Sequence, residues 1–220
     1  MPNWCDNQIT ITGPNSVIDK IEKIVNEENN NAENGLLQFF HPMPKELLET
    51  EAGPIAKTKA EKEERKARKL EFGAENWYDW RVNNWGTKWE VCEFYGVARQ
   101  HLNDSLDEST ISFSFSSAWA PPIGAYEKFL ENNSNCFLRA YYYEGGCDFM
   151  GLWEDGVDDC YAPSDYKSTD DFWQDGIGST LDDVFNITES MAEYEAEQEA
   201  EKEDVHEYTK GKAMNIGEEA

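Results

Sequence analysis

The stretch STISFSFSSAW, residues 109–119, alternates apolar and hydroxyl side chains with a period of two. Ile111, Phe113 and Phe115 fall on one side of an extended chain, and serines fall on the other. Such alternation is typical of a strand that buries one face and keeps the other face polar. The stretch therefore predicts a mainly antiparallel sheet with helices packed on one face.

The segments around this stretch alternate between strand and helix patterns. NQITITG, residues 7–13, predicts a half-buried strand, and the next residues carry apolar side chains at helical spacing after an Asn15 or Ser16 cap. In chain order, the expected elements are strand 7–13, helix from 15, strand 89–96, strand 109–115, helix 120–133 and strand 136–146. This order is that of the β-α-β-β-α-β ferredoxin-like sandwich, an α+β fold.

Further segments extend this core. An added β-hairpin is expected at 149–162, because Asp155-Gly156 is a strong turn signal between strand patterns. A charged helical insertion is expected at about 50–72. We predict one domain over 1–162, followed by an acidic loop and an acidic C-terminal helix or tail over 163–220.

The acidic residues are concentrated towards the C-terminus. The formal net charge is -26, of which residues 145–180 contribute -8 and residues 181–220 contribute -10. A chain of this charge repels nucleic-acid phosphates unless its charges are segregated. Direct binding of nucleic acid is therefore not expected from the acidic segments.

The five cysteines are scattered, and the sequence contains no CxxC pair. Met1 runs directly into PNWCDN without a secretory leader, and apolar runs fall short of the ~18–20 residues that span a membrane. These features predict reduced thiols in a cytoplasmic protein without a membrane partner.

Three separated blocks resemble the YubB-type ferredoxin-like domain. They are NWCDNQITITG (3–13), NWYDWRVNNWGTKWE (76–90) and SSAWAPPIGAYEKF (116–129). This family contains uncharacterised proteins of bacteriophages and conjugative plasmids. The resemblance covers roughly residues 2–155 and implies a ferredoxin-like fold and a mobile-element origin inside a bacterial host cell. It implies no activity, because the family has no established catalytic motif.

Tryptophans are unusually dense within the second block. A stacking platform for bases would need a positive groove, whereas Glu75, Asp79, Glu90 and Glu93 surround the indoles here. We therefore predict a structural aromatic core in which indole N–H groups bond to backbone carbonyls. Its members are Trp4, Trp77, Trp80, Trp85, Trp89 and Trp119.

Catalytic and metal-binding patterns are weak. The three histidines have no partner at ligand spacing, and the acids around residues 148–159 lack the spacing of a calcium loop. The sequence contains no nucleophile elbow, P-loop or HExxH motif. We expect no catalytic residue, metal or cofactor.

Two functions remain open. In the first, acidic residues mimic nucleic acid and bind a basic cleft of a host protein or nucleoprotein complex, as in anti-restriction or anti-CRISPR proteins. From Glu193, alternate residues are acidic, which on a helix spaces the charges by about 3 Å. The partner-binding residues would be Asp155, Asp158, Asp159, Asp170, Asp171, Glu193, Glu197, Glu199, Glu201 and Glu203.

In the second function, the domain binds nucleic acid directly through sheet aromatics and a basic arm at 57–69. This arm holds seven basic and three acidic residues. The overall charge favours the first function, and the local charge of the arm is the best argument for the second. Oligomeric state does not follow from the sequence.

Overall fold

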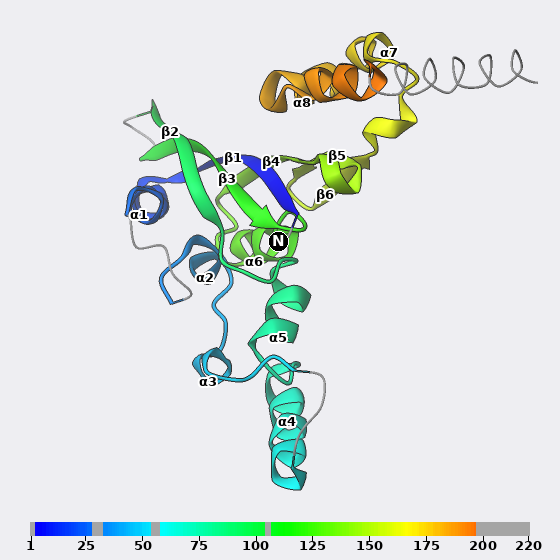
Figure 1. The fold of residues 1–220 in the computed structure, drawn as a ribbon. Coiled ribbons are helices and arrows are strands. Elements are labelled where there is room, and N and C mark those ends of the chain that lie inside the picture. The colour runs from blue at the N-terminus through cyan, green and yellow to red at the C-terminus, as the bar shows by residue number, and fades with distance from the viewer. Residues whose placement is uncertain (1–2, 28–32, 54–57, 104–106, 197–220) are drawn as a thin grey trace, which may run out of the picture. The chain divides into compact units, whose positions relative to one another are not determined.

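Six antiparallel strands form one sheet in the computed structural model, which describes residues 3–27, 33–53, 58–103 and 107–196 (Figure 1). The strand order across the sheet is β2-β3-β1-β4-β5-β6. The strands are β1 (Trp4–Pro14), β2 (Cys92–Asn103), β3 (Glu108–Ala118), β4 (Phe137–Glu144), β5 (Phe149–Glu154) and β6 (Val157–Tyr161). The predicted α+β class and the antiparallel sheet are confirmed.

The register of β1 places the apolar residues of three strands on one face. Ile9 pairs with Phe113 on β3 and with Ala140 on β4, and all three are buried. The alternate residues of β1 and β3 point to the other face, where Gln8 pairs with Ser114. The period-two pattern of the sequence thus separates an apolar face from a face rich in hydroxyl and amide groups.

Helices cover the apolar face. Figure 1 shows α1, α2 and α6 on the same side of the sheet. The helices of this part are α1 (Asn15–Asn26), α2 (Leu36–Phe40), α3 (Lys45–Leu48), α4 (Lys59–Phe72), α5 (Trp77–Asn84) and α6 (Ile123–Asn132), with a 3-10 turn η1 (Gly145–Cys147). Helix α1 buries Ile18, Ile21 and Val25, the stripe that its spacing predicts.

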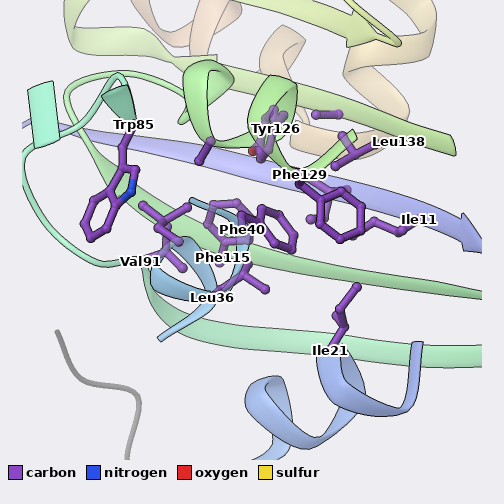
Figure 2. Packing of buried hydrophobic residues seen from close by; sticks show 14 of the residues in the cluster. Ile11, Ile21, Leu36, Phe40, Trp85, Val91, Phe115, Tyr126, Phe129 and Leu138 are labelled. Carbon is purple, nitrogen blue, oxygen red and sulfur yellow. The ribbon is translucent and has the colours of Figure 1, made fainter. Parts of the chain in front are cut away.

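Aromatic rings fill the space between these helices and the sheet. Figure 2 shows Phe40 of α2 against Phe129 of α6, and their ring centroids lie 4.5 Å apart. Trp85 is fully buried at one end of this cluster, and its indole N–H donates to the His41 carbonyl at 2.8 Å. The bond removes the cost of burying that donor.

The hairpin β5–β6 forms around the predicted turn. Asp155 and Gly156 both have positive φ angles, 46° and 94°, as the favoured two-residue hairpin turn requires. Glu154 pairs with Val157 across the turn, so the predicted hairpin is confirmed.

The middle of the chain contains a helix that was not predicted and a strand whose predicted start is wrong. The tryptophan-rich segment contains a helix, α5, because Asn76 caps it by accepting a hydrogen bond from the Asp79 N–H at 3.0 Å. The strand expected at 89–96 begins only at Cys92 and continues to Asn103. Its start is displaced because the Glu90 side chain turns towards the N-terminus of α2, where it accepts hydrogen bonds from Leu37 and Gln38.

The chain divides at Tyr161 and Ala162 into two compact units, each described by itself. The second contains a 3-10 turn η2 (Pro163–Asp165), α7 (Thr169–Gln174), α8 (Gly176–Phe185) and a helical stretch at 187–196. The expectation of an acidic loop at the start of the segment 163–220 is therefore wrong. Its residues form helices because Ser168 and Asp175 cap α7 and α8 through their side chains.

A small apolar cluster holds the helices of the second unit together. Phe172, Leu181 and Ile187 are fully buried, and the Tyr166 ring meets Phe172 edge-on at 4.9 Å. The described part of this unit ends at residue 196. The distal part of the expected acidic helix, residues 197–220, lies outside the described residues.

Candidate functional site

The described part of the second unit, residues 162–196, is called the acidic unit below. It contains nine acidic residues, and Lys167 is its single basic residue. The ion pairs found among the described residues all join side chains of the first unit. The acidic unit therefore carries negative charge that its own cations do not balance.

Some carboxylates of the acidic unit stabilise its fold through hydrogen bonds. Asp175 accepts hydrogen bonds from the Ile177 N–H at 3.1 Å and from the Tyr166 hydroxyl at 2.9 Å. Asp182 is buried and accepts from both the N–H and the hydroxyl of Thr188. These residues shape the unit and are poor candidates for contacts with a partner.

Three residues of the predicted acidic surface lie in the acidic unit. Asp170 is exposed in the first turn of α7, and Glu193 is exposed in the helical stretch that follows α8. Asp171 is also exposed, but its carboxylate accepts from the Lys167 N–H at 3.3 Å. The predicted contacts Glu197, Glu199, Glu201 and Glu203 lie outside the described residues.

The other three predicted acids lie on the β5–β6 hairpin. Asp155 accepts a hydrogen bond from the Leu138 N–H at 3.2 Å, and Asp158 accepts one from the Tyr142 hydroxyl at 2.7 Å. Asp159 is exposed on β6. The first two carboxylates therefore fasten the hairpin to β4, in addition to any role in binding.

The basic arm corresponds to α4, and part of its charge is bound within the first unit. Arg65 is buried, pairs with Glu61 at 2.7 Å and donates to the Gly53 carbonyl. Arg68 donates to the Glu75 carbonyl at 2.7 Å. Lys62 and Lys66 are exposed, so only some of the predicted phosphate contacts face solvent.

Only part of the predicted aromatic core is buried. Trp80 and Trp85 are buried, and Trp77 packs half-buried at the core margin. Trp4, Trp89 and Trp119 are 41%, 37% and 40% exposed, so their assignment to the core is wrong. They lie at the end of β1, before β2 and after β3, where no strand or helix of the described chain covers them fully.

These three tryptophans form one exposed corner together with a lysine. The Trp4 and Trp89 ring centroids lie 6.0 Å apart. The Lys88 ammonium lies 3.9 Å from the ring centroids of both Trp89 and Trp119. We call Trp4, Lys88, Trp89 and Trp119 the tryptophan corner; two of its indoles already hold an alkylammonium group between them.

Carboxylates lie beside the tryptophan corner. Asp6 follows Trp4 on the same face of β1, and its pairing through Ser116 to Cys92 brings Glu93 close. Burial raises the pKa of Asp6, and repulsion from Glu93 and Glu144 raises it further. This part of the sheet thus favours a cation.

Sequence reasoning missed the grouping of Asp6, Lys88 and Glu93. One signal was present: Trp4 lies shortly before the strand pattern at 7–13, and Trp119 closes the pattern at 109–119. Antiparallel pairing of those strands brings the two ends together, and Trp4 does pair with Ala118. The position of Glu93 depends on a bulged part of β2 and had no comparable signal.

One serine–histidine pair resembles a catalytic arrangement, but its hydrogen bonds oppose that role. The Ser109 hydroxyl lies 2.9 Å from His101 Nδ1 and donates to Asn15 Oδ1. With its proton directed to Asn15, the hydroxyl accepts from the imidazole, whereas a nucleophile must donate to its base. Ser109 is also fully buried, which closes it to a substrate.

Neither metal ligands nor a membrane span emerge from the described residues. Within 3–27, 33–53, 58–103 and 107–196, no group of three or more His, Cys, Asp or Glu side chains is arranged to hold a metal ion. No helix in the same ranges combines the length and apolar character needed to cross a bilayer. All five cysteines are free thiols.

Comparisons with known proteins add little. Neither a family model nor a curated protein matches the chain. Among solved structures, the chain is similar to the crystal structure of a protein api92 from Yersinia pseudotuberculosis, assigned to the family model DUF1281. The identity is 12%, the match covers 76% of this chain and 96% of that one, and the TM-score is 0.38.

Proposed function

We propose that this chain is a non-enzymatic binding protein that occupies a basic cleft of a nucleic-acid-handling or defence complex. In this proposal it is a bacteriophage or mobile-element protein acting in the cytoplasm of its bacterial host. Its acidic surface takes the place of nucleic acid and inhibits the complex. The observation that carries the proposal is the charge of the acidic unit, nine acids against one base on helices with a buried core.

The proposal depends on the acidic charges being held on ordered helices, and not only on their number. A disordered acidic tail keeps a partner's cations solvated, whereas charges fixed on helices present a defined field that speeds encounter and selects a basic surface. Phe172, Leu181 and Ile187 fix the helices that carry Asp170, Asp183 and Glu193. An acidic helix continuing beyond residue 196 is part of the proposal and would lengthen this surface.

We also propose a ferredoxin-like topology for the first unit. The order β2-β3-β1-β4 and the crossovers α1 and α6 support it, because a split β-α-β fold has this arrangement. The sequence blocks that resemble the YubB-type family support the same topology and the mobile-element origin. The hairpin β5–β6 then extends the sheet beyond β4.

The test neutralises the exposed acids of the acidic unit. Asp170→Asn, Asp183→Asn and Glu193→Gln are combined in one variant, and the full chain captures complexes from a nuclease-treated bacterial lysate. The measurement is displacement of labelled duplex DNA from the captured complex. At about 0.5 kcal/mol for each exposed charge, we expect displacement to need about tenfold more variant at low salt.

The matched control removes three exposed glutamates of the first unit, Glu46, Glu49 and Glu127, by substitution with glutamine. It changes the net charge equally and should displace DNA as the wild-type chain does. Equal weakening by both variants would show a non-specific charge effect and contradict the proposal. Failure of the wild-type chain to displace DNA would contradict it directly.

Direct nucleic-acid binding is the second candidate, and the exposed Lys62 and Lys66 of α4 favour it. It predicts a salt-dependent gel shift of DNA or RNA by the chain alone. Reversing the charges of Lys62 and Lys66 should abolish the shift without unfolding, because neither side chain is buried. The proposed function predicts no shift under the same conditions.

A further inference from the structure

The tryptophan corner exposes more aromatic surface than a core requires. Its three indoles are each about two-fifths exposed, in a chain that buries Trp80, Trp85 and Trp153. Exposed clusters of large aromatic rings mark interaction sites more often than scattered ones do. Tryptophan is also among the residues that dominate binding energy at protein interfaces.

The backbone holds this corner in a fixed shape. Trp119 has a φ of 75°, in the left-handed region that costs a non-glycine residue energy. Its N–H donates to the Asn3 carbonyl at 3.0 Å, and the Thr87 hydroxyl donates to the Ala118 carbonyl at 2.7 Å. These bonds tie the ends of β1 and β3 to the loop before β2, so the indoles are arranged before any partner arrives.

The chemistry of the corner suits a cation with an apolar stem. Two indole faces already hold the Lys88 ammonium, which shows that a cation fits between them. Asp6 follows Trp4 on the same face of β1, and Glu93 lies close enough to Asp6 to raise its pKa by repulsion. An indole face next to paired carboxylates is complementary to a group that is flat, cationic and rich in donors.

We propose that the tryptophan corner, with Asp6 and Glu93, binds an arginine side chain of a partner protein. A guanidinium stacks flat on an indole and donates two parallel hydrogen bonds to a carboxylate, whereas an ammonium does neither. Nucleic acid is disfavoured, because the carboxylates of Asp6 and Glu93 would repel its phosphates. The site lies in the first unit and does not depend on the role of the acidic unit.

The experiment titrates N-acetyl-arginine amide into the full chain and follows the indole N–H signals of its eight tryptophans by NMR. We expect the signals of Trp4, Trp89 and Trp119 to move. The signal of Trp173, a tryptophan of the acidic unit that is more exposed than these three, should stay in place. N-acetyl-lysine amide should bind at least about fivefold more weakly.

Two variants examine the origin of binding. Asp6→Asn with Glu93→Gln removes both charges at nearly constant size, and we expect at least about fivefold weaker arginine binding. The control, Glu46→Gln with Glu49→Gln, makes the same charge change on exposed side chains and should bind as the wild type does. Lys88→Gln removes the resident cation and should strengthen binding. Unchanged Trp85 and Trp153 signals show that each variant is folded.

Three results would overturn the inference. They are equal movement of Trp173 and the corner signals, equal affinity for the arginine and lysine probes, and equal binding by the carboxylate variant and its control. Movement of the corner signals with a single-stranded oligodeoxythymidine but not with arginine would assign the site to nucleic acid instead. The acidic-unit variant should give the same indole signals as the wild type. Its loss of DNA displacement therefore bears on the proposed function and leaves this inference unaffected.

Discussion

Glu90 provides the sharpest test of the electrostatics, because two opposing forces act on one carboxylate. It lies at the N-terminus of α2, where its oxygens accept from the N–H groups of Leu37, Gln38 and Val91 at 2.7, 3.1 and 3.2 Å. These donors and the nearby Arg81 favour the ionised form. Removal from water favours the neutral form and outweighs them, so burial raises the pKa of Glu90 to about 7.

The size of the effect follows from this shift. The ordinary pKa is 4.5, so the folded state binds the proton more tightly than the unfolded chain does. The contribution of this tighter proton binding to the free energy of unfolding is fully present below the pKa of the unfolded chain. It is lost as pH rises through the pKa of the folded state. The whole loss is about 3 kcal/mol, and about 2 kcal/mol of it falls between about pH 5.5 and about pH 8.

The assay compares wild type and Glu90→Gln by urea unfolding, followed by tryptophan fluorescence across that pH range, which avoids the pI of 4.3. The glutamine does not titrate, so we expect the wild type to lose about 2 kcal/mol relative to the variant as pH rises. Glu127→Gln, an exposed glutamate of α6, is the control for loss of one negative charge.

Two results would refute the reasoning. A difference between wild type and Glu90→Gln that stays constant with pH would mean that burial and hydrogen bonding cancel. A gain in stability of the wild type relative to Glu90→Gln as pH rises would mean that the three N–H donors dominate and hold the carboxylate ionised. Either result would place Glu90 among ordinary helix-capping acids.

Further expectations concern packing and thiol access. Trp85→Ala empties a fully buried site, and we expect the free energy of unfolding in urea to fall by about 3–5 kcal/mol. Trp173→Ala, at a half-exposed ring, should change it by less than about 1 kcal/mol. Gly151→Ala would overlap a tyrosine hydroxyl of β4 and lie 2.6 Å from a β6 carbonyl, so we expect a loss of about 1–3 kcal/mol in the same assay. In the native protein, a chromogenic disulfide should modify Cys147 and Cys160 quickly and the three less exposed thiols only on unfolding; rapid modification of all five would contradict the packing.

Local patterns predicted the parts of the fold that depend on local periodicity. The alternation in β1 and β3 and the stripe of α1 follow from side chains that repeat with the geometry of a strand or helix. The tryptophan-rich segment has no such period, so α5 was missed although Asn76 and Asp79 form its cap. Helix α7 has only six residues, and its cap at Ser168 was its main signal.

The candidate sites were less predictable, because exposure depends on position and not on residue type. Tryptophan is a residue type common in protein cores. Trp4 and Trp119 nevertheless lie where strands end and covering helices do not reach. The closeness of Asp6 and Glu93 requires β1 to pair with β3 and β3 with β2. Only the strand pairing of the folded chain brings these residues together.

The distribution of ion pairs links the two proposals. In the first unit, Arg99 binds Asp19 and Glu22 at 2.7 and 2.6 Å, and Arg139 binds Glu154 at 2.5 Å. Arginines engaged in this way have few donors left for phosphate. The acidic unit, with Lys167 as its single base, repels phosphate more strongly. The two proposals therefore share one premise, which is that each unit, taken by itself, attracts cationic groups: the proposed role of the acidic unit rests on its field, and the proposed role of the tryptophan corner rests on stacking.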